Sequence, residues 1–314
     1  MSSALVFFSH VSTVPSKAQR ELLTLASRFE NPTVAIASVP GEEALKVFGS
    51  YGIATVLQAE NPQASFGTHE LSVLDAALQH TDADLVLLEN DSFSRELGAR
   101  IAVRRNAAIV TDVIDVSADL IATKDELAGG YSASVKSATG VLIATVKPNS
   151  IEDAPLDCQD SVEVKNLELA APLVPAVSIV AADQKEASDR PALSEARIVV
   201  AGGRGVDGDF SAVEDLADAL GAAIGASRAA TDAGWISHDA QIGQTGVTVS
   251  PQLYISAGIS GAIQQKAGMQ TSKFIVAVNK DMDAPVFEIA DLGIVGDLAK
   301  VLPQAAAEIR RRQA

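Results

Sequence analysis

Short apolar runs alternate with segments of helical periodicity over the first 110 residues. Helical patterns lie near 41–50, 69–79 and 94–104, and a further helix starts at Pro15, where proline suits the first helical position. Strands that alternate with helices in this way form a parallel sheet covered on both faces. We therefore predict an α/β fold. The expected strands are Ala4–Phe8, Thr33–Ala37, Thr55–Leu57, Asp84–Leu88 and Ala108–Val110.

The pattern changes after about residue 113. Segments 113–122, 131–135, 141–146 and 161–165 predict short strands joined by turns, which favours antiparallel pairing. Residues 183–196 are polar and contain a proline, a composition typical of a linker. A length of 314 residues also fits about two domains. We predict an N-terminal α/β domain at 1–190 and a second domain at 197–314.

A second α/β pattern starts at Arg197. Strands are expected at 198–201, 253–256, 274–278 and 286–289, which predicts a Rossmann-like parallel sheet. A helix that begins near Phe210 ends at Gly221. Near the C-terminus, one helix over 296–302 stops before Pro303 and another covers 304–312.

Composition limits the classes of partner. The chain carries 24 basic and 40 acidic residues, a net charge of −16, so nucleic acid and anionic lipid are not expected partners. A single cysteine, Cys158, excludes an intrachain disulfide and favours a reducing, cytoplasmic location. No targeting segment is expected, because the first apolar run is short and Lys17 is the first basic residue.

The second domain is the better place for an anionic ligand. Residues 197–314 have a net charge of −3, against −13 for the first 196. No charged residue occurs between Asp239 and Lys266, but the amides, glycines and proline of this stretch argue against insertion into a membrane. The uneven charge also fits a merely solvated acidic surface on the first domain.

A glycine pattern G-x-G-x-x-G, formed by Gly203, Gly205 and Gly208, lies between the first strand and first helix of the second domain. In this context glycines let the backbone approach a pyrophosphate at a helix N-terminus. Arg228 follows the next strand and suits a 2′-phosphate, which keeps an NADP-dependent oxidoreductase open as a function. A glycine turn that binds no ligand is also open.

Four strand ends of this domain, one of them directly before Ser227, are followed by small or polar residues. Ligands of open parallel sheets bind beyond the carboxyl ends of the strands, so these ends predict one crevice. Its neutral donors suit a large uncharged ring system, and Arg204 or Arg228 suits phosphates or a developing anion. The four groups are 202–205, 227–228, 258–261 and 279–281, with Gln244-Thr245-Gly246 leading into the third strand.

Several catalytic sets are absent from the sequence. The four histidines lack metal-ligand spacing, and Gly258-Ile259-Ser260-Gly261-Ala262 misses the last glycine of a nucleophile elbow. There is no nucleotide-binding phosphate loop of the G-x-x-x-x-G-K-[ST] type. The chain therefore has the character of a cofactor carrier rather than an acid–base enzyme. A non-catalytic nucleotide-binding regulatory subunit is a third possible function.

The second domain resembles the alpha subunit of electron transfer flavoprotein over about 197–303. The resemblance implies that it binds FAD and that the first domain contacts a beta subunit. It also implies one-electron transfer from acyl-CoA dehydrogenases of fatty acid beta-oxidation to a membrane quinone oxidoreductase. The runs that carry it are Gly225–Ala230, Gly243–Gly246, Pro251–Ile255, Gly258–Gln264, Ala267–Met269, Asn279–Asp281 and Gly293–Val295.

The resemblance also implies which residues contact the flavin. Arg228 would lie against the isoalloxazine ring and Thr245 near its N5 atom. Ser260 and Gln264 would serve the ribityl and phosphate part, and Asn279 and Asp297 the adenosine end. The full set is Arg204, Ser227, Arg228, Ile242, Gly243, Gln244, Thr245, Ser260, Gly261, Ala262, Ile263, Gln264, Gln265, Asn279, Asp297 and Leu298.

Gln265 departs from the family pattern, in which a histidine near flavin O2 is common. A glutamine amide can donate the same hydrogen bond but cannot carry a positive charge. The resemblance therefore implies weaker stabilisation of negatively charged flavin states in this chain.

Overall fold

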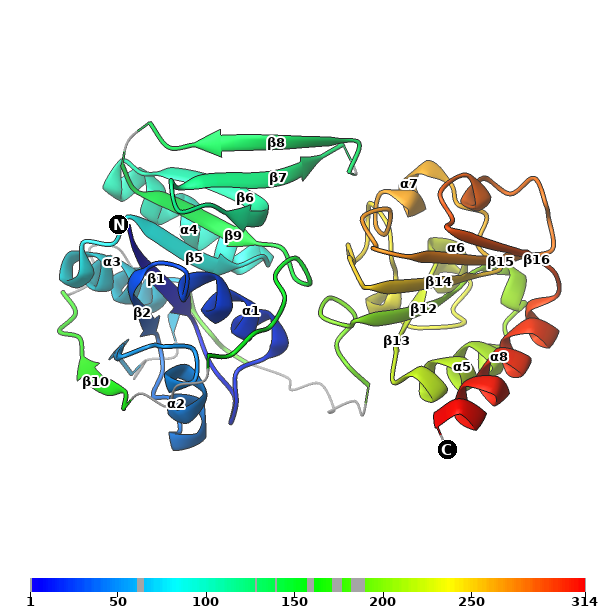
Figure 1. Ribbon diagram of the computed structural model, residues 1–314, viewed down its shortest axis with the longest axis horizontal. Helices are drawn as coiled ribbons and strands as arrows, with labels where there is room; N and C mark the ends of the chain where they lie inside the picture. The colour runs from blue at the N-terminus through cyan, green and yellow to red at the C-terminus, as the bar shows by residue number, and fades with distance from the viewer. Residues whose placement is uncertain are drawn as a thin grey trace. The chain divides into compact units, whose positions relative to one another are not determined.

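Figure 1 shows a computed structural model of the chain, which describes residues 2–60, 65–127, 129–138, 140–156, 161–170, 177–181 and 190–313. The chain divides into two compact units. The first comprises Met1–Glu126 with Tyr131–Lys185, and the second comprises Glu186–Ala314 with Leu127–Gly130. The first half of the expected linker, 183–189, lies outside the described residues. Within the described ranges, none of the helices has the length and apolar character needed to cross a membrane.

The first unit is built on a nine-stranded sheet. Its strands run parallel except for the last two, which extend one edge as antiparallel neighbours. In spatial order they are β10 (Glu163–Asn166), β3 (Thr55–Gln58), β2 (Glu30–Ile36), β1 (Ser3–Phe8), β5 (Leu85–Glu89), β9 (Leu142–Val146), β6 (Ala108–Val116), β7 (Ile121–Glu126) and β8 (Tyr131–Lys136). A separate antiparallel pair is formed by β4 (Ser65–Phe66) and β11 (Val177–Ser178).

Helices cover both faces of this sheet. Val6 and Phe8 of β1 point to the core under α1 (Lys17–Ala26) and α2 (Glu42–Gly49). Leu5 and Phe7 point to the opposite core, under α3 (Thr68–Thr81) and α4 (Ser92–Arg105). Alternate residues of one strand thus fill two cores, as the strand period of two requires.

Three expectations for the first unit are wrong. β9 lies between β5 and β6 and β10 beside β3, all in parallel, so antiparallel pairing holds only for β6, β7 and β8. Segment 113–122 is not one strand but the end of β6, a turn and the start of β7. Pro15 precedes α1, because the Ser16 side chain accepts the Gln19 N–H and so takes the N-cap position.

The second unit is a five-stranded parallel sheet in the order β13 (Ala223–Ala226), β12 (Ile198–Gly202), β14 (Leu253–Ala257), β15 (Ile275–Asn279) and β16 (Leu292–Val295). Figure 1 shows α5 (Ser211–Leu220) and α8 (Leu298–Gln313) side by side on one face. The shorter helices are η1 (Arg204–Val206), α6 (Arg228–Asp232), η2 (His238–Ala240), α7 (Ile263–Lys266) and η3 (Pro285–Glu288). The α/β prediction is confirmed for both units.

Two expectations near the C-terminus are wrong. Residues 286–288 belong to η3 rather than to a strand, and Ile289 is its C-cap; Pro285 begins this helix, where proline is favoured. Helix α8 continues through Pro303. A proline inside a helix costs about 3 kcal/mol, and burial of Leu302 and Ala306 beside α5 offsets that cost.

Candidate functional site

The second sheet has a topological switch point between β12 and β14, because the chain goes from β12 to β13 on one side and then crosses to β14 on the other. Open parallel sheets bind ligands at such points. A cavity of about 600 Å³ lies there, bordered by the loops that follow β12, β13, β14 and β15. This volume is in the range of small-molecule and cofactor sites.

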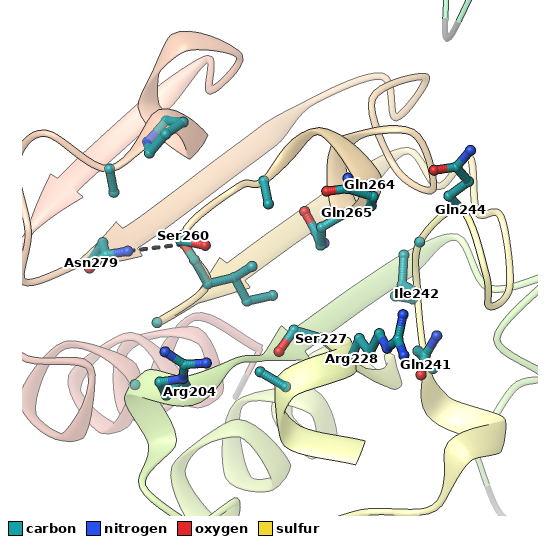
Figure 2. A pocket seen from close by; sticks show the side chains of 18 of the residues that line it. Arg204, Ser227, Arg228, Gln241, Ile242, Gln244, Ser260, Gln264, Gln265 and Asn279 are labelled. Carbon is teal, nitrogen blue, oxygen red and sulfur yellow. Dashed lines mark hydrogen bonds between the residues drawn. The ribbon is translucent and has the colours of Figure 1, made fainter. Parts of the chain in front are cut away.

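Twelve of the sixteen residues expected at the site line this one cavity. Figure 2 shows Gln265 on one side of the cavity and Ser227 and Arg228 on the other. The twelve are Arg204, Ser227, Arg228, Ile242, Gly243, Gln244, Thr245, Ser260, Ala262, Gln264, Gln265 and Asn279.

Four expected residues do not line the cavity. Gly261 packs against the backbone of Val286, and the Ile263 side chain is exposed on α7. Asp297 accepts the N–H of Ala299 and lies 3.5 Å from Lys280. Leu298 is buried in the core beneath the sheet. The structure therefore places these four residues outside the cavity lining.

The cavity also contains residues outside the expected set. Gly205, Ala229, Gly258, Ile259 and Asp281 belong to the strand-end groups or runs on which the crevice was predicted. Gln241 directly precedes Ile242 and carries the same side-chain amide as the other glutamines of the lining. Ala284 and Pro285 have no polar or charged signal in the sequence that points to a site. The complete set of additional lining residues is Gly205, Ala229, Gln241, Gly258, Ile259, Asp281, Ala284 and Pro285.

The glycine-rich loop after β12 is hydrogen-bonded to the loop after β14, so two of its backbone N–H groups are not free to bind a ligand. The N–H groups of Gly203 and Gly205 donate to the carbonyls of Ala257 and Gly258, each at 2.9 Å. A Cβ on Gly203 would lie 2.5 Å from the Gly258 carbonyl oxygen. The glycines are therefore required for close approach of the loops after β12 and β14. The expectation that their backbone cradles a pyrophosphate is wrong for these two amides.

Two arginines supply the positive charge of the cavity. Arg228 Nε donates to Asp232 at 3.1 Å, one helical turn further along α6. Arg204 follows β12, is exposed, and makes no side-chain hydrogen bond or ion pair with the described part of the chain. Asp281 is the one carboxylate among the described lining residues. The cavity thus offers one partly compensated and one uncompensated cation to an anionic ligand.

Two polar atoms of the lining are buried without a hydrogen-bond partner, the hydroxyl oxygen of Ser227 and Oε1 of Gln265. Nε2 of Gln265 donates to the Tyr254 hydroxyl at 2.8 Å. Tyr254 is fully buried, and burial raises the pKa of its hydroxyl, so the phenol stays neutral. The Gln265 amide is thus bound to Tyr254 at one end, and its Oε1 atom and the Ser227 hydroxyl are available to a polar ligand.

Among the described residues, no three His, Cys, Asp or Glu side chains are grouped so that they could hold a metal ion.

Comparison with known proteins gives a consistent result over the whole chain. Residues 4–172 match the electron transfer flavoprotein domain, and residues 192–270 match the electron transfer flavoprotein FAD-binding domain. The chain belongs to the electron transfer flavoprotein alpha-subunit family. Its cofactor is FAD, as the resemblance implied.

Individual alpha subunits of the family are similar over most of their length. The electron transfer flavoprotein subunit alpha of Mycobacterium leprae is 42% identical over all of both chains. The subunit of Bacillus subtilis is 38% identical over 83% of this chain and 82% of its own. That of Paracoccus denitrificans is 39% identical over 88% of both.

The residues of the cavity fit FAD. Its isoalloxazine ring carries amide-like edges that can pair with the orphaned Ser227 hydroxyl and the Gln265 amide. Its diphosphate is anionic and suits the uncompensated charge of Arg204. The lining combines apolar atoms such as those of Ile242 and Ile259 with a few polar groups, as cofactor sites do.

Proposed function

We propose that this chain is the alpha subunit of a heterodimeric electron carrier located in the cytoplasm. With a beta subunit, it accepts electrons from acyl-CoA dehydrogenases and related flavoenzymes of fatty acid beta-oxidation. It passes them to an electron transfer flavoprotein–quinone oxidoreductase. The observation that supports this proposal most is the single cavity at the switch point of the second sheet, which collects twelve of the expected residues.

In this proposal, individual residues of the chain have separate roles in binding FAD. FAD supplies a ring system that takes up and releases electrons when bound. Arg228 favours negative charge on that ring, and Arg204 binds the diphosphate. Thr245 and Gln265 hold polar edges of the ring. Residues 197–314 hold the cofactor and 1–190 contact the beta subunit.

An NADP-dependent oxidoreductase is less well supported by this geometry. Dinucleotide sites of that kind use free amides in the glycine-rich turn, whereas the amides of Gly203 and Gly205 are paired with Ala257 and Gly258.

The visible absorption spectrum of the purified protein distinguishes the two functions. The chain is co-expressed with its beta subunit and purified without added nucleotide. We expect the visible bands of oxidised flavin, bleached by a reduced acyl-CoA dehydrogenase. A colourless protein with bound NADP would refute the proposal.

Replacement of Gln265 with histidine is expected to make the flavin more sensitive to pH. An imidazolium beside the ring would stabilise negative reduced states by about 1 kcal/mol. The pKa of an unperturbed histidine is about 6.5, so this charge is gained as the pH falls through that region. The reduction potential of Gln265→His should therefore rise relative to that of the native protein as the pH falls from 8 to 6. Parallel potential curves for the two proteins would contradict this role.

A further inference from the structure

We propose that the first unit binds the beta subunit through the outer edge of β8, where a strand of that subunit extends the nine-stranded sheet. The inference deepens the proposed function, on which it rests, by naming the contact within residues 1–190. β8 lies at one end of the sheet, and in the described part of the chain it pairs only with β7 (Figure 1). Its outer edge presents backbone N–H and C=O groups with which an extended segment can pair.

The two ends of this sheet differ in how they are protected against a further strand. β10, at the opposite end, has four residues, and two of them are Glu163 and Lys165, which form an ion pair of 3.0 Å. Charges on an edge strand are a common means of preventing pairing with another chain. β8 has six residues, no proline, and one charge at its last position, Lys136. Of these two ends, β8 is therefore the one suited to accept a strand.

The hydrogen bonds of β7 show which way the backbone of β8 points. The Ile121 carbonyl, at the start of β7, accepts the N–H of Ser117 beside β6. Backbone groups of successive residues point to opposite sides of a strand. Every second residue of β7, beginning with Ile121, therefore points to β6, and the residues between them point to β8.

The residues of β8 that lie opposite those intervening residues are Tyr131, Ala133 and Val135. Their backbone groups are used in the pair with β7. The remaining residues of β8 direct their N–H and C=O groups to the outer edge, and they are Ser132, Ser134 and Lys136.

The side chains of this edge suit a second protein chain. Ser132 and Ser134 are exposed and small, so another backbone can approach closely. Tyr131 is 68% exposed, and tyrosine is enriched at protein interfaces. Charge indicates which chain binds there. The first 196 residues carry a net charge of −13, so two copies of this unit would repel each other. The beta subunit is therefore favoured over a second copy.

Amide hydrogen exchange of the native heterodimer tests the pairing residue by residue. In a free edge strand, the amides of Ala133 and Val135 exchange slowly and those of Ser134 and Lys136 exchange fast, because only the first two are hydrogen-bonded. A strand added at the edge makes all four slow. We expect their exchange rates in the heterodimer to lie within about tenfold of one another.

A pair of proline variants tests the same edge by affinity. Ser134→Pro removes an N–H that points outward and leaves the pair with β7 intact. Val164→Pro is the matched control on β10, because the neighbouring Glu163 N–H donates inward to Ala54 at 2.8 Å and that of Val164 points outward. We expect Ser134→Pro to raise the dissociation constant of the heterodimer about tenfold, and Val164→Pro to change it by less than about twofold. Sedimentation over a dilution series measures both.

Three results would overturn this role of β8 while leaving the proposed function intact. They are alternating exchange along β8 in the heterodimer, equal effects of the two proline variants, and a chain without the beta subunit that sediments as a dimer with a protected β8. The exchange pattern is read on the native protein, so it decides the question even where Ser134→Pro folds poorly. Failure of the native chain to form a heterodimer would overturn the proposed function as well.

Discussion

Replacement of Gly203 with alanine is expected to destabilise the second unit by about 1–3 kcal/mol, the usual cost of forcing extra atoms into packed structure. The new methyl would meet the Gly258 carbonyl oxygen at 2.5 Å and Ile259 Cα at 2.8 Å. Both are backbone atoms and cannot rotate away. The loops after β12 and β14 would have to separate, which deforms the cavity, so we also expect at least a tenfold loss in FAD affinity.

Urea unfolding and flavin titration of the heterodimer measure these two effects. Gly221→Ala is the matched control in the same unit. Gly221 has φ +60° but nothing within 4 Å of an added Cβ, so alanine there costs about 1 kcal/mol of backbone strain only. We expect Gly221→Ala to bind FAD with native affinity. Native FAD affinity in Gly203→Ala would show that close approach of the two loops is not needed for the site.

Replacement of Arg228 with alanine is expected to lower the reduction potential of the bound flavin. The guanidinium lines the cavity and attracts the negative charge that the ring gains on reduction. Its side chain is 69% exposed and paired with Asp232, so solvent and the carboxylate weaken this attraction. We expect a change of about 1–2 kcal/mol, or about 20–40 mV for a two-electron couple.

Asp232→Asn provides the opposite change at the same place. It removes the carboxylate that lies 3.1 Å from Arg228 Nε and leaves the guanidinium uncompensated. The potential should then rise, by less than it falls in Arg228→Ala because Asp232, unlike Arg228, does not line the cavity. Spectroscopic redox titration of the three proteins at low salt measures both shifts. A fall in potential in both variants would contradict an electrostatic role for Arg228.

The location of the site could be predicted because it depends on strand ends. Polar residues that follow parallel strands meet at one edge of the sheet whatever the details of the loops, and Ser227, Ser260 and Asn279 do so here. Strand direction in the first unit could not be predicted from local pattern. Leu142–Val146 is apolar except for Thr145 and fully buried, as a parallel strand is, but only its non-local partners β5 and β6 determine its direction.

Other features were missed because tertiary contacts outweigh local preference. Pro303 predicts a helix end, but packing of Leu302 beside α5 keeps α8 continuous. The spacing of Gly203, Gly205 and Gly208 predicts a phosphate-binding turn, yet no sequence pattern shows that Gly258 receives one of those amides.

A crystal structure of the heterodimer with FAD would show where the cofactor binds. We expect the isoalloxazine ring in the cavity of the second unit, with Arg228 and Thr245 in contact with it and the diphosphate near Arg204. We also expect polar partners for the Ser227 hydroxyl and Oε1 of Gln265, the two lining atoms that are orphaned here. Flavin contacts concentrated in residues 1–190, with this cavity holding only water, would show that the cofactor site is not in the second unit.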